Sequence, residues 1–223
     1  MAHAWQNGVY LTRWLPDLAF GYGYPFFVYR EAAPLYAVLL PHLAGLPLPA
    51  ASNLFYAVTI LLCGIFMFLW ARDLFGERAA LVSAVAYMAA PYVLVDALIR
   101  GNSPESLALP LFPFLLLVGR RWVLHGSVKS FVAGAVGLAF LSISHNISTF
   151  LFAPTLAVYL GALALVSGRG SGIGKRLFRL VALLALGLGM AFFYTGGALL
   201  EMDQVTLEMS TTTRNNDWRY NFA

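Results

Sequence analysis

Three long runs of this chain contain no Asp, Glu, Lys, Arg or His. They cover residues 53–71, 148–167 and 180–200. A helix of about 20 apolar residues just crosses the hydrocarbon of a bilayer, because each residue adds only about 1.5 Å. Hydrophobic residues make up 60% of the chain and charged ones 11%, whereas soluble domains carry about 25% charged residues. The sequence therefore predicts an all-α, polytopic membrane helical bundle.

The basic residues gather in three short segments between the apolar runs. These segments hold nine of the fourteen Lys and Arg residues, but only two of the ten acidic residues. Because loops rich in Lys and Arg remain in the cytoplasm, we expect these three loops to be cytoplasmic and the protein to lie in the plasma (inner) membrane. Because the cytoplasmic loops account for the net charge of +4, that charge does not indicate a nucleic-acid partner. The nine cations are Arg72, Arg78, Arg120, Arg121, Lys129, Arg169, Lys175, Arg176 and Arg179.

Alternation of apolar runs and basic loops predicts about six transmembrane helices. They lie within a bundle at 53–200, which follows an outer-face loop with an interfacial helix at 1–52 and precedes the start of an outer-face segment at 201–223. Both ends of the chain look cut from something longer. The expected spans are about 53–71, 79–96, 104–123, 129–145, 147–167 and 179–200.

Residues 32–46 are apolar, but prolines interrupt them at Pro34 and Pro41. A run this short is more often interfacial or re-entrant than spanning, so we expect it to lie along the outer surface of the membrane. A spanning helix here remains an alternative, because it would leave the direction of every later span unchanged.

Several kinds of site are not indicated by the sequence. Cys63 is the single cysteine and sits in an apolar run, so an intramolecular disulfide plays no part. The four histidines show no metal-binding spacing, and the metal and cofactor are left open, with a divalent cation as one option. The glycine-rich stretch at 168–174 lacks the preceding strand of a nucleotide-binding motif.

Polar residues of unusual type instead gather in the segments expected on the outer face. An ionisable group near the apolar slab is costly, so each is expected either to be paired or to carry function. The structural alternative is an ion pair of Asp17 with Arg13 or of Glu105 with Arg100, and backbone capping by His145 and Asn146. The candidate residues are Arg13, Asp17 and Tyr24 in the first outer loop, Arg100 and Glu105 in the second, and His145 and Asn146 in the third.

Three sequence blocks resemble a known family. RWLPDLAFGYGYPFFVYREAAPLYAVLLPHLAGL, RGNSPESLALPLFPFLLL and SHNISTFLFAP occur in family order within residues 9–160. They are similar to the outer loops of bacterial membrane proteins labelled 6-pyruvoyl-tetrahydropterin synthase-related. The label does not imply pterin chemistry, which needs a three-histidine zinc site on a soluble fold. In layout the family resembles the GT-C multi-span glycosyltransferases, which take sugars from polyprenyl-phosphate carriers.

That resemblance implies roles for particular residues. Asp17 and Glu105 become candidate catalytic acids, as proton acceptor or metal partner. Arg13 and Arg100 become candidate ligands of the lipid phosphate. His145, Asn146 and Tyr24 join them as substrate-binding candidates. Relative to the family, the chain is expected to be shortened at both ends. Whether it catalyses sugar transfer without the missing segments is left open.

The function expected from these residues is transfer of sugar from a polyprenyl-phosphate-linked donor at the outer face. The expected partners are the lipid bilayer and a lipid-linked sugar donor. The alternative is a non-catalytic membrane component or transporter that handles a lipid-linked glycan or a cell-surface polymer. A third possibility is an assembly subunit whose outer loops bind another protein.

Overall fold

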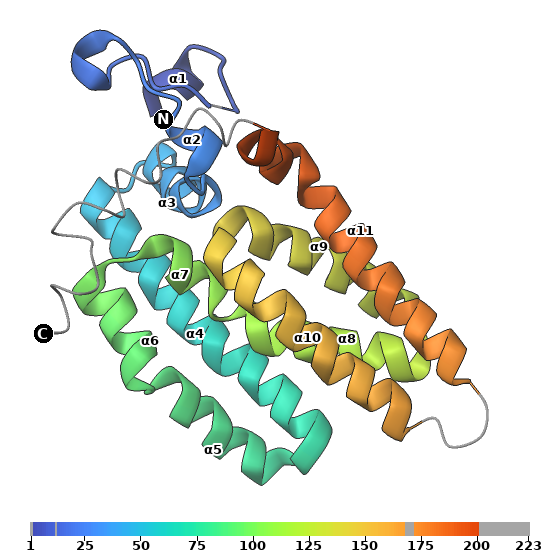
Figure 1. The fold of residues 1–223 in the computed structure, drawn as a ribbon. Helices are drawn as coiled ribbons and strands as arrows, with labels where there is room; N and C mark the ends of the chain where they lie inside the picture. The colour runs from blue at the N-terminus through green and yellow to red at the C-terminus, as the bar shows by residue number, and fades with distance from the viewer. Residues whose placement is uncertain (1, 12, 168–171, 201–223) are drawn as a thin grey trace, which may run out of the picture.

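The structure, a computed structural model, describes residues 2–11, 13–167 and 172–200, and the predicted outer segment 201–223 lies outside this range. The predicted all-α bundle is confirmed, since the described part of the chain contains helices, one isolated β-bridge and no strand (Figure 1). The elements are α1 (Ala2–Gln6), η1 (Ala19–Gly21), α2 (Phe26–Tyr29), α3 (Ala33–Leu43), α4 (Leu48–Phe75), α5 (Glu77–Met88), α6 (Pro91–Val95), η2 (Asp96–Arg100), α7 (Ser103–Ala108), α8 (Leu111–His125), α9 (Val128–Ser144), α10 (Asn146–Val166) and α11 (Ile173–Leu200).

Five helical stretches among the described residues are long and apolar enough to cross a membrane. Two of them are interrupted helices. Pro91 begins α6 after a break that follows α5, and α7 gives way to α8 at Pro110. Proline has no N–H and clashes with the preceding turn, so it starts new helical segments more readily than it continues old ones. The five stretches are Leu48–Phe75, Glu77–Arg100, Ser103–His125, Asn146–Val166 and Ile173–Leu200.

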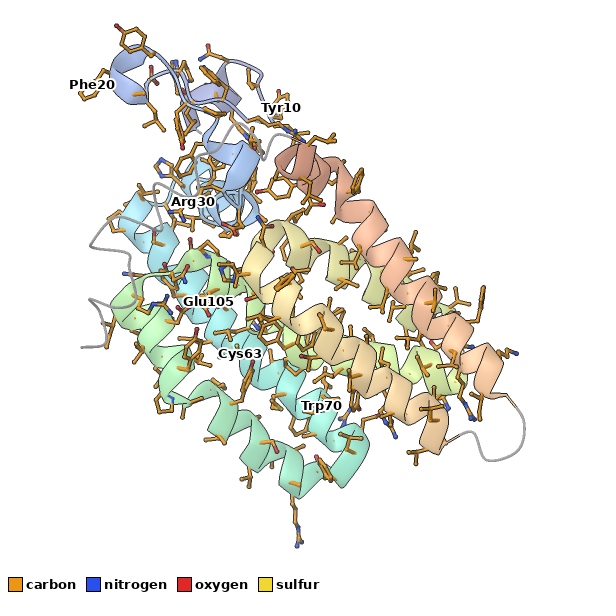
Figure 2. All side chains as sticks on the ribbon, in the orientation of Figure 1. Tyr10, Phe20, Arg30, Cys63, Trp70 and Glu105 are labelled. Atoms are coloured by element: carbon orange, nitrogen blue, oxygen red, sulfur yellow. The ribbon has the colours of Figure 1, made fainter. Side chains whose placement is uncertain are left out.

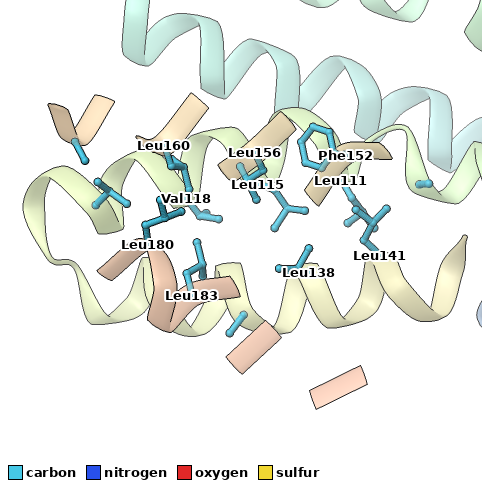
Figure 3. Packing of buried hydrophobic residues seen from close by; sticks show 14 residues of the cluster. Leu111, Leu115, Val118, Leu138, Leu141, Phe152, Leu156, Leu160, Leu180 and Leu183 are labelled. Carbon is cyan, nitrogen blue, oxygen red and sulfur yellow. The ribbon is translucent and has the colours of Figure 1, made fainter. Parts of the chain in front are cut away.

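A sixth apolar helix, α9, is shorter than these at 17 residues. It packs against α8, α10 and α11 in the middle of the bundle (Figure 1). The main hydrophobic core lies among these four helices, as Figure 3 shows. Its fully buried members include Leu115, Leu138, Leu156, Leu160 and Leu183.

Small residues allow close approach of these helices. A Cβ atom added at Gly187 of α11 would lie 2.9 Å from the Cβ of Leu138 of α9, and one at Gly134 of α9 would lie 2.8 Å from the Leu183 side chain. Without the hydrophobic driving force that water supplies, helices in a membrane associate through such close packing. The glycines therefore hold α9 and α11 in one register.

The segment 32–46 forms α3, an 11-residue helix that packs on α4, α7 and α9. At 1.5 Å per residue it extends about 16 Å, roughly half of the hydrocarbon thickness of a bilayer. The N-terminal elements through α3 lie at one end of the bundle, beside the start of α4, α7 and the end of α11 (Figure 1). This end carries the candidate site.

Candidate functional site

An ionic cluster stands where the second apolar stretch ends and the third begins. The π-helical turn η2 carries Asp96 and Arg100, and α7 carries Glu105. Between them the chain reverses at Gly101, whose φ of 60° lies in the left-handed region that glycine adopts without steric cost. The Tyr56 hydroxyl of α4 donates to the Gly101 carbonyl at 2.7 Å and so ties this corner to the bundle. Single π-helical turns are frequent at functional sites.

Asp96 is the most deeply placed acid of the cluster. Its side chain is 0% exposed, and its Oδ2 accepts a hydrogen bond from the Ser106 hydroxyl at 2.9 Å. Its Oδ1 lies 3.0 Å from Arg100 Nη1, an ion-pair distance, but the angle is not that of a hydrogen bond. The carboxylate is therefore held by one hydrogen bond and one Coulombic contact. A buried carboxylate without such partners would be strongly disfavoured.

Glu105 has both carboxylate oxygens occupied. Oε1 accepts from the Tyr92 hydroxyl, and Oε2 accepts from Asn102 Nδ2 at 2.9 Å and from Arg100 Nη1 at 3.2 Å. One guanidinium group thus faces two carboxylates. The arrangement fixes the direction in which the half-exposed Arg100 side chain points.

A cavity of about 500 Å³ lies between this cluster and the N-terminal segment. Arg30 and Glu31, which follow α2, line it together with Arg100 and Asn102. Figure 2 shows Arg30 and Glu105 on separate elements at the same end of the bundle. The cavity is lined by Phe26, Arg30, Glu31, Leu35, Arg100, Gly101, Asn102, Ser103 and Pro104.

Glu31 is the carboxylate that lines the cavity. One of its oxygens, Oε1, accepts from the backbone N–H of Asn146 at 3.2 Å, at the first residue of α10. The N-terminus of a helix carries a partial positive charge and unpaired N–H groups, so it stabilises an anion there. The neighbouring residue Arg30 is anchored through its carbonyl, which accepts from the Tyr194 hydroxyl of α11 at 2.5 Å.

Four of the residues predicted from the sequence come together around this cluster. Arg100 and Glu105 are in direct contact, and the His145 ring lies within electrostatic range of the Glu105 carboxylate. His145 Nδ1 is also 2.6 Å from the Ser148 hydroxyl oxygen. Asn146 takes part through its backbone N–H rather than through its amide side chain.

The other three predicted residues do not line the cavity. Asp17 is exposed and forms no hydrogen bond or ion pair with another described residue. Arg13 donates to the Phe193 carbonyl of α11 at 2.7 Å and has no ion pair with Asp17 within the described chain. Tyr24 pairs through its backbone with Leu15 in an isolated bridge of the same loop.

Several residues of the site were not selected from the sequence. Asp96 is one of them, although an acid next to an apolar run with Arg at i+4 is a signal that the sequence contains. The adjacent charges of Arg30 and Glu31 would suggest a mutual ion pair. Instead, Arg30 lies over the Phe26 ring with its guanidinium carbon 5.7 Å from the ring centroid, and Glu31 binds α10. Only the tertiary contacts of α2 with α11 and of Glu31 with the first residue of α10 place them at the cavity.

Comparison with protein-family models, with curated proteins and with solved structures found no match to this chain. Within the described residues, no group of three or more His, Cys, Asp or Glu side chains is placed to hold a metal ion. The fold itself defines only a broad class of protein. Five long apolar helices fit an integral membrane protein, with a polar, partly open site at one end of the bundle.

Proposed function

We propose that this protein is a GT-C-like glycosyltransferase, as the resemblance of its loops implies, and that it transfers sugar from a polyprenyl-phosphate donor. The observation that supports this most is the cavity in which Arg30, Arg100 and Glu31 meet at the end of an apolar bundle. The proposal places this end at the outer face of the plasma membrane, with the basic loops in the cytoplasm.

The two arginines suit the phosphate of such a donor. A guanidinium group presents parallel N–H donors that match phosphate oxygens, and it stays charged at any physiological pH. The volume of about 500 Å³ lies within the range of small-molecule sites, about 300–1,000 Å³. It is large enough for one sugar and its phosphate.

A second hollow offers a place for the lipid part of the donor. It has a volume of about 370 Å³ and is almost entirely apolar, with Ala33, Leu40, Phe140, Ile143 and Phe193 among its lining residues. These come from α3, α9 and α11, and Glu31 precedes α3 by two residues. The proposal places the prenyl chain there, on the face of α3 opposite to Leu35, with the donor phosphate at Arg30 beside the start of that helix.

Glu31 is the group best placed to accept a proton. In the proposed reaction the acceptor hydroxyl oxygen attacks the anomeric carbon, and the bond from that carbon to the phosphate oxygen breaks. Polyprenyl phosphate leaves with the bonding electrons, and Glu31 takes the hydroxyl proton. Glu105 acts as a positioning residue, because it contacts Arg100 and does not line the cavity.

The test is Glu31→Gln in the protein reconstituted into liposomes with a polyprenyl-phosphate-linked sugar. Loss of a general base should lower kcat by about 10²-fold or more with little change in KM. Glu77→Gln is the matched control, since Glu77 is an exposed acid at the first residue of α5 and does not line the cavity. An unchanged kcat in Glu31→Gln would remove this residue from the chemistry, and no transfer by the parent protein would contradict the proposal.

One observation favours the second candidate, a component that binds a lipid-linked glycan without reacting with it. Both oxygens of Glu105 are already occupied, as expected for a carboxylate that shapes a binding site. In that case Arg100→Gln would weaken binding of the lipid-linked sugar, while Glu31→Gln would leave binding unchanged. Neither the wild-type protein nor either variant would release product. Binding of the lipid measured beside turnover separates the two candidates.

A further inference from the structure

A third hollow, of about 640 Å³, lies between α10 and α11, which run side by side in the bundle (Figure 1). Its lining residues on α10 fall between Asn146 and Pro154, and those on α11 fall between Leu188 and Leu199. On both helices they have the i, i+3, i+4 spacing of a single helical face. Ser142 of α9 completes the lining of this space, the α10–α11 hollow.

The depth of the α10–α11 hollow matches one leaflet of a membrane. Its lining spans eight residues along α10 and eleven along α11, which is about 12 and 16 Å at 1.5 Å per residue. Half of the hydrocarbon thickness of a bilayer is about 15 Å. Beyond it the two helices meet, because a Cβ atom added at Gly161 of α10 would lie 3.9 Å from the Leu180 side chain of α11. The hollow therefore ends within the bundle.

The lining changes from polar to apolar with depth. Its four polar side chains lie close to the helix ends at the candidate site, whereas Ala153, Pro154 and Leu188 line the deeper part. Three of the four are hydroxyl groups that donate to carbonyls of their own helices, so their oxygens remain as acceptors. The profile suits a molecule with a polar head and a hydrocarbon tail. The polar side chains are Ser142, Asn146, Thr149 and Thr195.

A hydrocarbon chain fits this space better than a helix of another protein does. Phe150 at its rim is 77% exposed, so the hollow is accessible from the membrane. A transmembrane helix is about 10–12 Å wide and has to cross both leaflets. Because α10 and α11 come together deeper in the bundle, such a helix would fill the hollow along only part of its length. A lipid tail needs one leaflet only.

The polar end of the hollow adjoins the carboxylate assigned as proton acceptor. Asn146 lines the hollow, and its backbone N–H donates to Glu31 Oε1 at 3.2 Å. The neighbouring face of α11 lines the hollow assigned to the prenyl chain of the donor. Phe193 belongs to that hollow and Phe192 to the α10–α11 hollow. The outer half of α11 thus has space for one lipid chain on each side.

Given the proposed function, on which this step rests, we propose that the α10–α11 hollow binds the hydrocarbon tail of the sugar acceptor. The acceptor is then a membrane lipid with a hydroxyl headgroup. Its hydroxyl oxygen forms the bond to the anomeric carbon, the bond from that carbon to the donor phosphate oxygen breaks, and the hydroxyl proton passes to Glu31. Two lipid substrates held on one protein meet in a fixed orientation.

The first test measures binding without turnover. The protein in liposomes is exposed to dodecanol that carries a photoreactive diazirine in its chain, and the labelled residues are mapped by mass spectrometry. We expect labelling within 146–154 and 188–199 that saturates and that excess dodecanol displaces, whereas butanol does not. Labelling no stronger there than at the exposed Val181, which lies outside the hollow, would overturn the proposal.

A filled hollow provides the variant for this test. Ala198 lines the hollow, and Ala198→Trp should bind the probe about tenfold more weakly, because the tail can no longer bury its methylene groups there. Ala185→Trp is the matched control, at an exposed position of α11 outside the hollow. Melting temperatures show whether both variants fold, and the wild-type labelling pattern decides the matter if Ala198→Trp does not. A folded Ala198→Trp that labels like the wild type would contradict the assignment.

The second test measures transfer of sugar from the polyprenyl-phosphate donor to dodecanol and to butanol, which share a primary hydroxyl and differ in their tails. We expect Ala198→Trp to lower kcat/KM for dodecanol about tenfold and to leave that for butanol unchanged, since only the tail contacts the hollow. Equal effects on the two alcohols would overturn the lipid acceptor and leave sugar transfer standing. Saturable labelling without transfer to either alcohol would overturn the acceptor role together with the proposed function.

Discussion

At the scale of single residues, burial separates acids that belong to the site from acids that do not. Asp96 is fully enclosed and hydrogen-bonded to Ser106, whereas Asp17 stands in an exposed loop with no partner among the described residues. A carboxylate is retained in an apolar setting only where neighbouring donors compensate for lost water. Enclosure with specific donors is therefore a better guide to this site than proximity along the chain.

The hydrogen bond to Asp96 makes Ser106→Ala a sensitive substitution. It would leave the Oδ2 of a buried carboxylate without a donor, and we expect the free energy of unfolding to fall by about 1–3 kcal/mol. Ser144→Ala is the control, because the buried Ser144 hydroxyl donates only to the helical carbonyl of Phe140. Reversible unfolding in mixed detergent measures both variants. Equal, small losses would mean that Asp96 does not depend on Ser106.

At the scale of elements, the prolines and glycines explain how the helices are divided and joined. Pro91 and Pro110 divide two of the long stretches, and the short elements η2 and α7 between them carry Arg100 and Ser103 at the cavity. Gly101 reverses the chain between them. Gly134 and Gly187 bring α9 and α11 into contact. The irregular turns lie at the site, whereas the close helix packing lies within the bundle, between α9 and α11.

The contact of α9 with α11 predicts opposite effects for two glycines of α11. Gly187→Ala would place a methyl group 2.9 Å from the Cβ of Leu138, an atom that cannot move without its backbone, so we expect a loss of about 1–3 kcal/mol. Gly189→Ala meets no atom within 4 Å, and alanine should stabilise the helix there by up to about 1 kcal/mol. Thermal unfolding in detergent checks both. A neutral Gly187→Ala would show that α9 and α11 can slide apart at no cost.

At the scale of the whole molecule, two ionic clusters stand at opposite ends of an apolar bundle. The one at the cavity contains Asp96, Arg100 and Glu105, and the other contains Asp73 with Arg120. The helices of a bundle in lipid satisfy their backbone groups internally. Ionic side chains are costly within the hydrocarbon, so they are expected at the two interfaces. The distribution of Lys and Arg then predicts which end faces the cytoplasm.

Cysteine labelling tests that orientation in intact cells. We expect Asp17→Cys to react with a membrane-impermeant maleimide and Lys129→Cys to react only after the membrane is permeabilised. The wild-type protein serves as the blank, because its single cysteine, Cys63, is buried in α4. The reverse labelling pattern would place the cavity in the cytoplasm and exclude an outer-face donor.

The sequence alone determined the class of the fold and where most of the apolar helices lie. Runs such as 53–71 and 180–200 contain no charge, and a polar backbone in lipid has few alternatives to a helix. It also brought Arg100 and Glu105 forward as partners, because they are five residues apart on one corner. These are local properties, which composition and spacing express directly.

Only the tertiary structure decided which distant residues share the cavity. Glu31 reaches the N-terminus of α10 across 115 positions of the chain, and Arg13 contacts α11 instead of Asp17. Nothing in the local sequence separates Glu31 from Asp17, since both are single acids in a loop rich in aromatic residues. Their different environments arise from the packing of α2 and α3 on the bundle. Burial and long-range contact are properties of the folded chain, and no run of neighbouring residues contains them.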